Sequence, residues 1–494
     1  MIRRRLLVCI ALAALIAASL SVRLGNPSLH TDEITYMSSV LESKIQGTVF
    51  PVQGNGVLFL NKPPLSFWLM RLSYEVLGPS PFAARLPSAL VTAGTGVVVY
   101  LFGAAVFGEA VGIVAALIFV FTPGLMAVHG IRSATPDALE ILLVTSAIVC
   151  LELWRRRRQP WMLTCLVACV GVSSWVKSPF ALVVFLAYLL ATELPARRAG
   201  QGTPRLGATV ALVAGVWLGI YLLWLGTLST AMSPRAVAKR LLVQQYANRI
   251  EGQMGKLEGP GFYLTSVAGD FGPLLLLPLG AVAFGWLASR RGWKPSHHDT
   301  ACLVAWSLVA PVLATASASK LPWYAYLSYP GIALLAALSA RLLAQVVSGR
   351  RSVQAALLAA TILVVAWRVW RMPFDVVWPA EARYHGMMGR LWEIARDDPG
   401  IVLVPGPGFE LPRQREDAGR EARLYIRTLF WLQSGRPTGP DACRAVLVNR
   451  RRDASSKKGV LELYRPIRKR GTPLLMVDDC EGWLIEQLTG EEVY

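Results

Sequence analysis

Side chains able to do chemistry fall in five short segments of this 494-residue chain, each beside a long apolar run. The segments are Asp32-Glu33-Ile-Thr-Tyr36, Asn61-Lys62-Pro-Pro-Leu, Arg132-Ser-Ala-Thr-Pro-Asp137, Lys177-Ser-Pro and Ser319-Lys320-Leu-Pro-Trp-Tyr324. A carboxylate can take a proton from an attacking hydroxyl, while lysine and arginine stabilise charge that develops on a phosphate leaving group. Together the segments suit the displacement of a phosphate by a hydroxyl.

Each segment also has an ordinary structural explanation when taken alone. Thr31 or Asp32 could cap a helix that runs to Leu41, and Lys62 could extend from an apolar stretch to the membrane interface. The two prolines after Lys62 hold it near the start of an apolar helix, where the helix dipole favours an anion. The joint placement of the segments, rather than any one of them, favours a site.

The composition indicates which elements must position these residues. Hydrophobic residues make up 54% of the chain and charged residues 16%, against roughly 45–50% and about 25% in soluble domains. The net charge of +19 would by itself fit a nucleic-acid binder. Runs such as Val111–Val128 exclude that class, as well as a disordered chain, and indicate an integral membrane protein.

We predict an all-α polytopic protein with about eleven spans, and thirteen as the upper bound. The predicted spans are 6–22, 82–103, 110–128, 137–154, 161–176, 178–192, 207–227, 271–289, 300–316, 322–342 and 352–370. Lys177-Ser-Pro could make 161–192 one kinked passage. The first run resembles a signal peptide, but it lacks a clean cleavage site, which favours a retained helix.

The basic residues predict the orientation. Arg155–Arg158 and the arginines between 197 and 205 lie in segments that alternate with loops carrying single basic residues. The positive-inside rule then places the N-terminus in the cytoplasm of a bacterium and the chain in its inner membrane. All five segments fall at the outer ends of different spans.

Two outer loops and a C-terminal region complete the organisation. The loops are 23–81, with helices expected at 32–45 and 65–77, and 228–270, with an amphipathic segment at 233–262. They interrupt a transmembrane catalytic domain of residues 1–370. Residues 371–494 contain β-like runs at 401–404, 445–448, 460–464 and 473–477, and helices near 383–396 and 482–488, which predicts a small periplasmic α/β domain. Cys443 and Cys480 lie in that domain and could form a disulfide bond.

The outer motifs resemble a known family. Asp32-Glu33-x-x-Tyr36, Lys62-Pro-Pro-Leu-x-x-Trp68 and Phe82-Ala-Ala-Arg85-Leu-Pro-Ser88 are similar to motifs of the bacterial protein-mannosyltransferase-like glycosyltransferases. This group is glycosyltransferase family 39 in the broad sense, and it includes the lipid A aminoarabinose transferases. The resemblance covers residues 5–345 approximately.

The resemblance implies a GT-C fold and a sugar transfer from a polyprenyl-phosphate donor. It implies catalytic roles for Asp32 and Asp137, and contacts of Lys62, Arg132 and Lys320 with the donor phosphate. Further candidates for the cavity are Glu33, Tyr36, Lys177 and Tyr324.

Two positions depart from the family pattern. Thr35 stands where many relatives have arginine, and Asn61 stands where the lipid A type often has an acidic residue. A neutral amide is a poor ligand for Zn²⁺. We therefore expect no resident metal, with a divalent cation kept as the alternative.

The resulting hypothesis is an inverting membrane glycosyltransferase that uses an undecaprenyl-phosphate-linked sugar at the outer face of the inner membrane. The acceptor is a lipid, glycan or protein hydroxyl, with lipid A modification as one candidate role, and no nucleic acid is involved. The alternatives are a transporter or flippase of a lipid-linked anion, and an inactive scaffolding relative.

Overall fold

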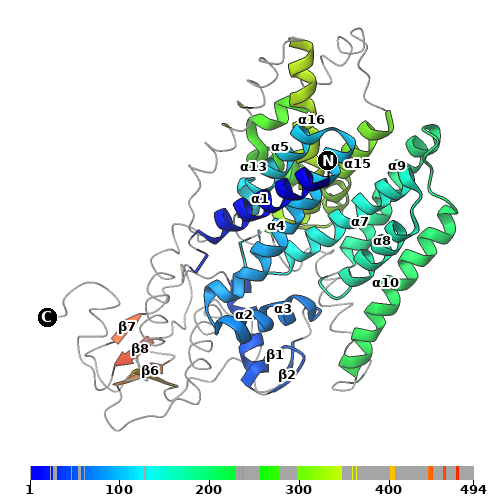
Figure 1. Ribbon diagram of the computed structural model, residues 1–494. Coiled ribbons are helices and arrows are strands. Elements are labelled where there is room, and N and C mark those ends of the chain that lie inside the picture. Colours follow the sequence, from blue (N-terminus) through cyan, green and yellow to red (C-terminus); the bar gives the residue numbers. More distant parts are fainter. Residues whose placement is uncertain are drawn as a thin grey trace.

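Apolar helices make up most of the residues described by the structure, a computed structural model (Figure 1). The described residues are 2–22, 24–25, 31–45, 47–53, 57–59, 62–126, 130, 132–177, 179–229, 233, 235, 237, 256–278, 297–347, 359, 363, 401–405, 443–448, 460–462 and 474–477.

Six helical segments are long and apolar enough to cross a membrane. They comprise α1 (Ile2–Ser21), α4 (Pro81–Val106), α9 (Phe180–Arg198), α10 (Leu206–Ser229), α15 (His297–Thr315) and the continuous pair η3 (Pro322–Ser328) and α16 (Tyr329–Val347). Two shorter apolar helices, α5 (Glu109–Val120) and α8 (Pro160–Ser173), pack among them. The chain is therefore a multi-pass membrane protein.

The 21-residue helix α7 (Asp137–Arg157) is long enough to span but carries acidic residues near both ends. Glu140 pairs with Lys177, and Glu152 pairs with Arg155 and Arg156. Charges inside a membrane bundle are tolerated when they face its interior and are paired. The acidic residues of α7 follow this rule.

Most predicted spans coincide with a helix. Helices α8 and α9 are separate, which excludes one kinked passage over 161–192. The predicted span 110–128 is too long, because α5 ends at Val120 and the four-residue α6 (Pro123–Met126) follows. Proline disfavours helical geometry at the residue before it, which explains a break ahead of Pro123.

Two other predicted spans are described only in part. Span 271–289 is described as far as residue 278. At its start, α13 (Phe262–Phe271) is followed by the 3-10 helix η2 (Gly272–Leu275). Span 352–370 lies outside the described residues apart from two single positions, and most of the amphipathic segment 233–262 lies outside them as well.

Two helices and a short hairpin gather at one end of the bundle, the lower end in Figure 1. They are α2 (Thr31–Ile45), α3 (Leu65–Leu77) and the antiparallel strands β1 (Val52–Gln53) and β2 (Val57–Leu58). The predictions of helices at 32–45 and 65–77 are confirmed. We name this end the outer end, following the predicted orientation, and the opposite end the inner end.

The second outer loop is tied to the turn between α15 and η3. Strand β3 (Lys256–Leu257) pairs antiparallel with β4 (Ser319–Lys320). The backbone N–H of Leu321 donates to the hydroxyl of Tyr263, at 3.3 Å. The end of this loop is thereby fixed against the segment that contains Lys320.

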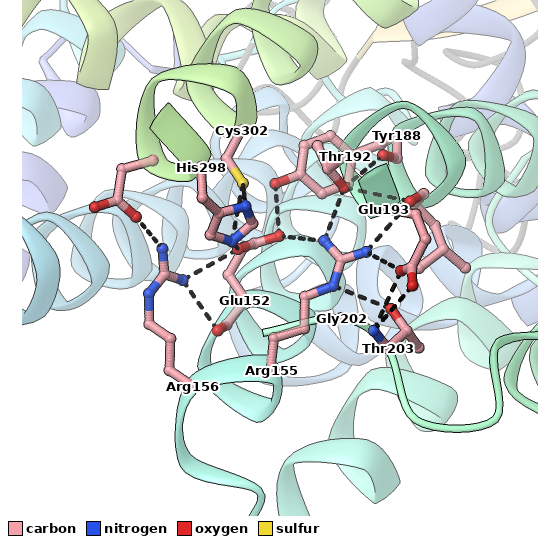
Figure 2. Close-up of polar contacts among 12 residues, drawn as sticks. Glu152, Arg155, Arg156, Tyr188, Thr192, Glu193, Gly202, Thr203, His298 and Cys302 are labelled. Carbon is pink, nitrogen blue, oxygen red and sulfur yellow. Dashed lines mark hydrogen bonds and ion pairs between the residues drawn. The ribbon is translucent and has the colours of Figure 1, made fainter. Parts of the chain in front are cut away.

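Buried and partly buried polar residues join three helices and the segment before α10 at the inner end, and we name them the inner polar cluster (Figure 2). Its members are Glu152, Arg155 and Arg156 on α7, Tyr188, Thr192 and Glu193 on α9, Thr203 before α10, and His298 and Cys302 on α15. Arg155 donates to Glu152 at 2.8 Å and to Glu193 at 3.0 Å, and both side chains accept further bonds. Arg155 and Arg156, which belong to the arginine run that predicts the orientation, therefore also join helices through ion pairs.

Backbones of α4 and α5 touch where glycine removes a side chain. A Cβ placed on Gly112 would lie 2.5 Å from the carbonyl oxygen of Tyr100 and 2.7 Å from the amide nitrogen of Ala104. Small residues permit such close helix packing in membranes.

We expect Gly112→Ala to destabilise the protein by about 1–3 kcal/mol, because backbone atoms cannot move aside as a side chain can. The measurement is the midpoint of thermal unfolding in detergent. Gly219→Ala on α10 is the matched control, since its Cβ would meet nothing within 4 Å. An equal midpoint for the two variants would contradict the close approach.

Four strands of the C-terminal region form one sheet in the order β5-β6-β8-β7. They are β5 (Ile401–Pro405), β6 (Cys443–Val448), β7 (Val460–Glu462) and β8 (Leu474–Val477). β5 and β6 are parallel, with Ile401 opposite Cys443, and β8 is antiparallel to both β6 and β7. All four predicted strands are confirmed; the helices near 383–396 and 482–488, and Cys480, lie outside the described residues.

Candidate active site at the outer end

The first turn of α2 contains both acidic residues of the Asp-Glu motif, and the structure separates them. Glu33 is fully buried and forms a two-bond ion pair with Arg85 of α4, at 2.8 and 2.9 Å. Its Oε1 also accepts the backbone N–H of Ala134 at 2.7 Å. Glu33 therefore holds α2 to α4 and to the loop at 132–136, which is a structural role.

Asp32 is partly exposed beside it. The two residues are about 100° apart around the helix, so the burial of Glu33 turns Asp32 to another side. Helix α2 begins at Thr31, which places Asp32 in the first turn, where a carboxylate interacts favourably with the helix dipole. Of the two carboxylates, Asp32 is the more exposed.

A second charged group lies at the start of α7. The ammonium of Lys177, in the turn between α8 and α9, contacts Asp137 at 2.7 Å and Glu140 at 3.1 Å. All three side chains are buried. Burial alone would lower the pKa of Lys177, but the charges of Asp137 and Glu140 outweigh it and raise the pKa above its ordinary value. Lys177 therefore stays positively charged.

Lys62 belongs to the same neighbourhood. The backbone N–H of Leu65, three residues after it, donates to the carbonyl of Trp175 at 3.0 Å, two residues before Lys177. Lys62 is also close enough to Glu140 for their charges to interact. The Lys-Pro-Pro segment and the Lys-Ser-Pro turn thus meet at the first turn of α7.

These contacts connect four segments at the outer end. Glu33 joins α2 to the 132–136 loop, which leads into Asp137, and Asp137 joins the turn at Lys177. That turn contacts the segment at Lys62. We name Asp32, Lys62, Asp137, Glu140 and Lys177 the outer charge group.

Tyr324 joins the group and Lys320 does not. The Lys177 ammonium lies over the Tyr324 ring, 5.6 Å from its centroid, in a cation–π contact. The Lys320 ammonium instead donates to the carbonyls of Thr315 and Ser317, at 3.2 and 2.6 Å. Lysine near the C-terminus of a helix commonly satisfies its last carbonyls, and Lys320 does so at Thr315, the last residue of α15.

Arg132 and Tyr36 are also buried. The Arg132 guanidinium donates to the backbone carbonyl of Val22, at the end of α1. The Tyr36 ring packs edge-on against Phe59 and Phe67, with centroids 6.0 and 5.3 Å apart. Tyr36 also lines a small pocket together with Ser66, Met70, Ser88, Thr135 and Leu139. This pocket lies among α2, α3, α4 and the start of α7, beside the outer charge group.

The sequence motifs mark neither Glu140 as a member of the outer charge group nor Arg85 as the partner of Glu33. Asp137 and Glu140 are three residues apart, so they share one face of a helix that begins after Pro136. This spacing is a signal that the sequence contains. The partner of Arg85 is 52 residues away, and no local pattern indicates it.

The inner polar cluster also contains a set of atoms typical of metal sites. Glu152, His298 and Cys302 each present a potential ligand atom, all within 4.8 Å of one another. Both oxygens of Glu152 are already occupied, one by Arg155 and Tyr188 and the other by Arg156 and His298. Two guanidinium groups at this carboxylate oppose a cation. The chemistry of the donor set fits a structural hydrogen-bond network, and Asn61, the family's metal-ligand position, lies outside the described residues.

Comparisons with known proteins agree with this architecture. The family model described as dolichyl-phosphate-mannose-protein mannosyltransferase matches residues 61–220. A comparison with curated protein sequences finds no match.

Solved structures match over nearly the whole chain. ArnT from Cupriavidus metallidurans bound to undecaprenyl phosphate has a TM-score of 0.66 at 16% identity, covering 94% of this chain and 97% of that one. Its apo state has a TM-score of 0.62 at 15% identity, with the same coverage. The archaeal oligosaccharyltransferase AglB from Archaeoglobus fulgidus, in complex with an inhibitory peptide and a dolichol-phosphate, has a TM-score of 0.52 at 12% identity, covering 88% of this chain and 65% of that one.

At these identities the structural matches show the fold. The matched family segment begins at Asn61 and includes the Lys-Pro-Pro motif, Arg85, Asp137, Glu140 and Lys177. The chain is a polytopic membrane protein with the GT-C fold, and its segment 61–220 is similar to the dolichyl-phosphate-mannose-protein mannosyltransferases.

Proposed function

We propose that this chain is an integral membrane glycosyltransferase that takes a sugar from a polyprenyl-phosphate donor, of the undecaprenyl type, at the outer face of a bacterial inner membrane. The observation that carries the proposal is the meeting of the segments of Lys62, Asp137 and Lys177 at the outer end, where α2 with the partly exposed Asp32 is held to the 132–136 loop through Glu33. The GT-C fold and the polyprenyl phosphates in related structures support it.

The proposed reaction is a single displacement at the anomeric carbon of the sugar. The oxygen of the acceptor hydroxyl attacks this carbon, and its proton passes to Asp32. The bond from the carbon to the phosphate oxygen breaks, and its electron pair remains on the lipid phosphate. A single displacement inverts the configuration at the anomeric carbon.

Lys62 stabilises the departing phosphate in this scheme, because a positive charge placed where negative charge develops lowers the barrier. The ion pair of Asp137 and Lys177 fixes the start of α7 against the turn between α8 and α9. Arg132 and Lys320 are further candidates for contact with the phosphate, and both also donate to backbone carbonyls, Arg132 to that of Val22 and Lys320 to those of Thr315 and Ser317. The acceptor is a hydroxyl of a lipid, glycan or protein, and residues 371–494 form a periplasmic domain near it.

The test of the enzyme class is a transfer assay with protein purified into nanodiscs. Radiolabelled polyprenyl-phosphate sugars serve as donors and a bacterial membrane extract as the acceptor source. Label that leaves the donor and enters the extract identifies a glycosyltransferase, and fractionating the product identifies the acceptor class. Absence of transfer with every donor, together with intact donor binding, would favour the transporter or scaffold.

We expect Lys62→Ala to weaken the binding of undecaprenyl phosphate by about ten- to a hundredfold, since a hydrogen bond to a charged group contributes about 1.5–3 kcal/mol. The measurement is displacement of labelled undecaprenyl phosphate from the protein in nanodiscs. Lys44→Ala is the control, because Lys44 is also at the outer end but pairs with the exposed Glu75. Equal affinities for the two variants would remove Lys62 from the phosphate site.

A further inference from the structure

Glu140 is a member of the outer charge group with a buried oxygen that lacks a hydrogen-bond partner among the described residues. Its side chain is buried at 3% exposure, and its Oε2 contacts Lys177 at 3.1 Å. Its Oε1 is enclosed and has no hydrogen-bond partner in the part of the chain that the structure describes. The two oxygens of a carboxylate diverge, so Oε1 is directed away from the bond that Oε2 makes.

A buried acceptor without a donor is costly, about 1–3 kcal/mol and more when the group is charged. Buried polar atoms are nearly always satisfied, and each exception needs an explanation. The neighbouring charges do not supply a donor for Oε1, since the Lys177 ammonium is shared between Asp137 and Oε2 of Glu140. A donor that arrives with the substrate would remove the cost.

We propose that Glu140 Oε1 binds the sugar of the lipid-linked donor, accepting a hydrogen bond from a hydroxyl or amino group on its ring. The inference rests on the proposed function, in which Lys62 binds the phosphate. Lys62 is within electrostatic reach of Glu140, and the sugar ring is the part of the donor attached directly to that phosphate. A carboxylate next to the phosphate site is therefore placed to select the sugar, while Lys62 selects the lipid phosphate.

The proposal separates two binding energies that can be measured independently. The probes are undecaprenyl phosphate itself and a panel of undecaprenyl-phosphate-linked sugars: mannose, galactose and an amino sugar. Their affinities are measured by competition with labelled undecaprenyl phosphate, on wild type and variants in nanodiscs. We expect the wild type to bind at least one linked sugar more tightly than the bare lipid phosphate.

Glu140→Gln keeps the size of the side chain but replaces one hydrogen-bond acceptor with a hydrogen-bond donor. The amide oxygen stays with Lys177 and the NH₂ group replaces Oε1, so that a donor would face a donor. We expect the preference for the linked sugar to fall by about ten- to a hundredfold, with the affinity for bare undecaprenyl phosphate unchanged within twofold. The panel distinguishes the two donor groups, because an amine site favours the amino sugar and a hydroxyl site favours a neutral sugar.

Thr145→Val is the matched control. Thr145 is also buried on α7, and its hydroxyl likewise lacks a hydrogen-bond partner among the described residues, but it lies deeper in the membrane by sequence. We expect this variant to keep the sugar preference. If Glu140→Gln does not fold, Glu140→Asp withdraws the carboxylate while keeping its charge, and deoxy sugars remove the donor group without any change to the protein.

Three results would overturn the proposal. An equal loss of affinity for bare and sugar-linked lipid would show that Glu140 acts only through Lys177 and Lys62. An unchanged preference in Glu140→Gln, or no preference in the wild type, would exclude contact with the sugar. If the wild type does not bind undecaprenyl phosphate at all, the proposed function itself fails, and this result is distinct because it needs no variant of Glu140.

Discussion

Asp32→Asn should reduce sugar transfer by about a hundred- to ten-thousandfold, the range expected when a positioned proton acceptor is removed. Asparagine has nearly the same shape, so donor binding and thermal stability should remain close to those of the wild type. Since Asp32 is partly exposed while Glu33 bears the structural contacts, the effect should be confined to the chemical step.

The measurement is single-turnover transfer from the radiolabelled donor, with the unfolding midpoint recorded in parallel. Glu75→Gln is the control, because Glu75 is an exposed carboxylate on α3 at the same end of the molecule. It should transfer sugar at the rate of the wild type. A fully active and well-folded Asp32→Asn protein would remove Asp32 from the catalytic role.

The contrast between Asp32 and Glu33 shows what the sequence can and cannot predict. The acidic pair in a short helix at the outer end is readable from the sequence, and α2 and α3 lie where the apolar spacing predicts them. The choice between the two carboxylates depends on Arg85 and on the N–H of Ala134, which are 52 and 101 residues from Glu33. Hydropathy and spacing report local periodicity, so they do not indicate partners at such separations.

The same reasoning explains the other differences. Lys320 is a residue type that commonly binds anions. Its ammonium also contacts the carbonyls of Thr315, at the end of α15, and of Ser317, which local hydrophobicity does not reveal. The arginines of 155–158 predict the orientation by their number. The local sequence does not indicate that the ion pairs of Arg155 with Glu193 and of Arg156 with Asp299 join three helices. The β-like runs of the C-terminal region were predictable because short apolar runs bounded by turn signals are a local feature.

Arg85→Met should be the most destabilising of these substitutions, at about 3–5 kcal/mol, because it leaves the buried carboxylate of Glu33 without its cation. Both side chains are at most 1% exposed, so water cannot replace the lost partner. Arg85 also donates to the carbonyl of Leu24 at 2.9 Å, and the connection between α1 and α2 loses that bond as well. We expect a clear drop in the unfolding midpoint in detergent.

A second substitution separates the unpaired charge from the lost packing. In the double variant Arg85→Met with Glu33→Gln, the neutral amide still accepts the N–H of Ala134, so part of the stability should return. The exposed pair of Lys44 and Glu75, which also involves α2, is the matched control, and neutralising it should change the midpoint little. If Arg85→Met and Lys44→Met had the same midpoint, the pair of Glu33 and Arg85 would not be what fixes α2. The assignment of Asp32 as the accessible carboxylate would then lose its structural basis, because that assignment depends on Glu33 being held in the interior.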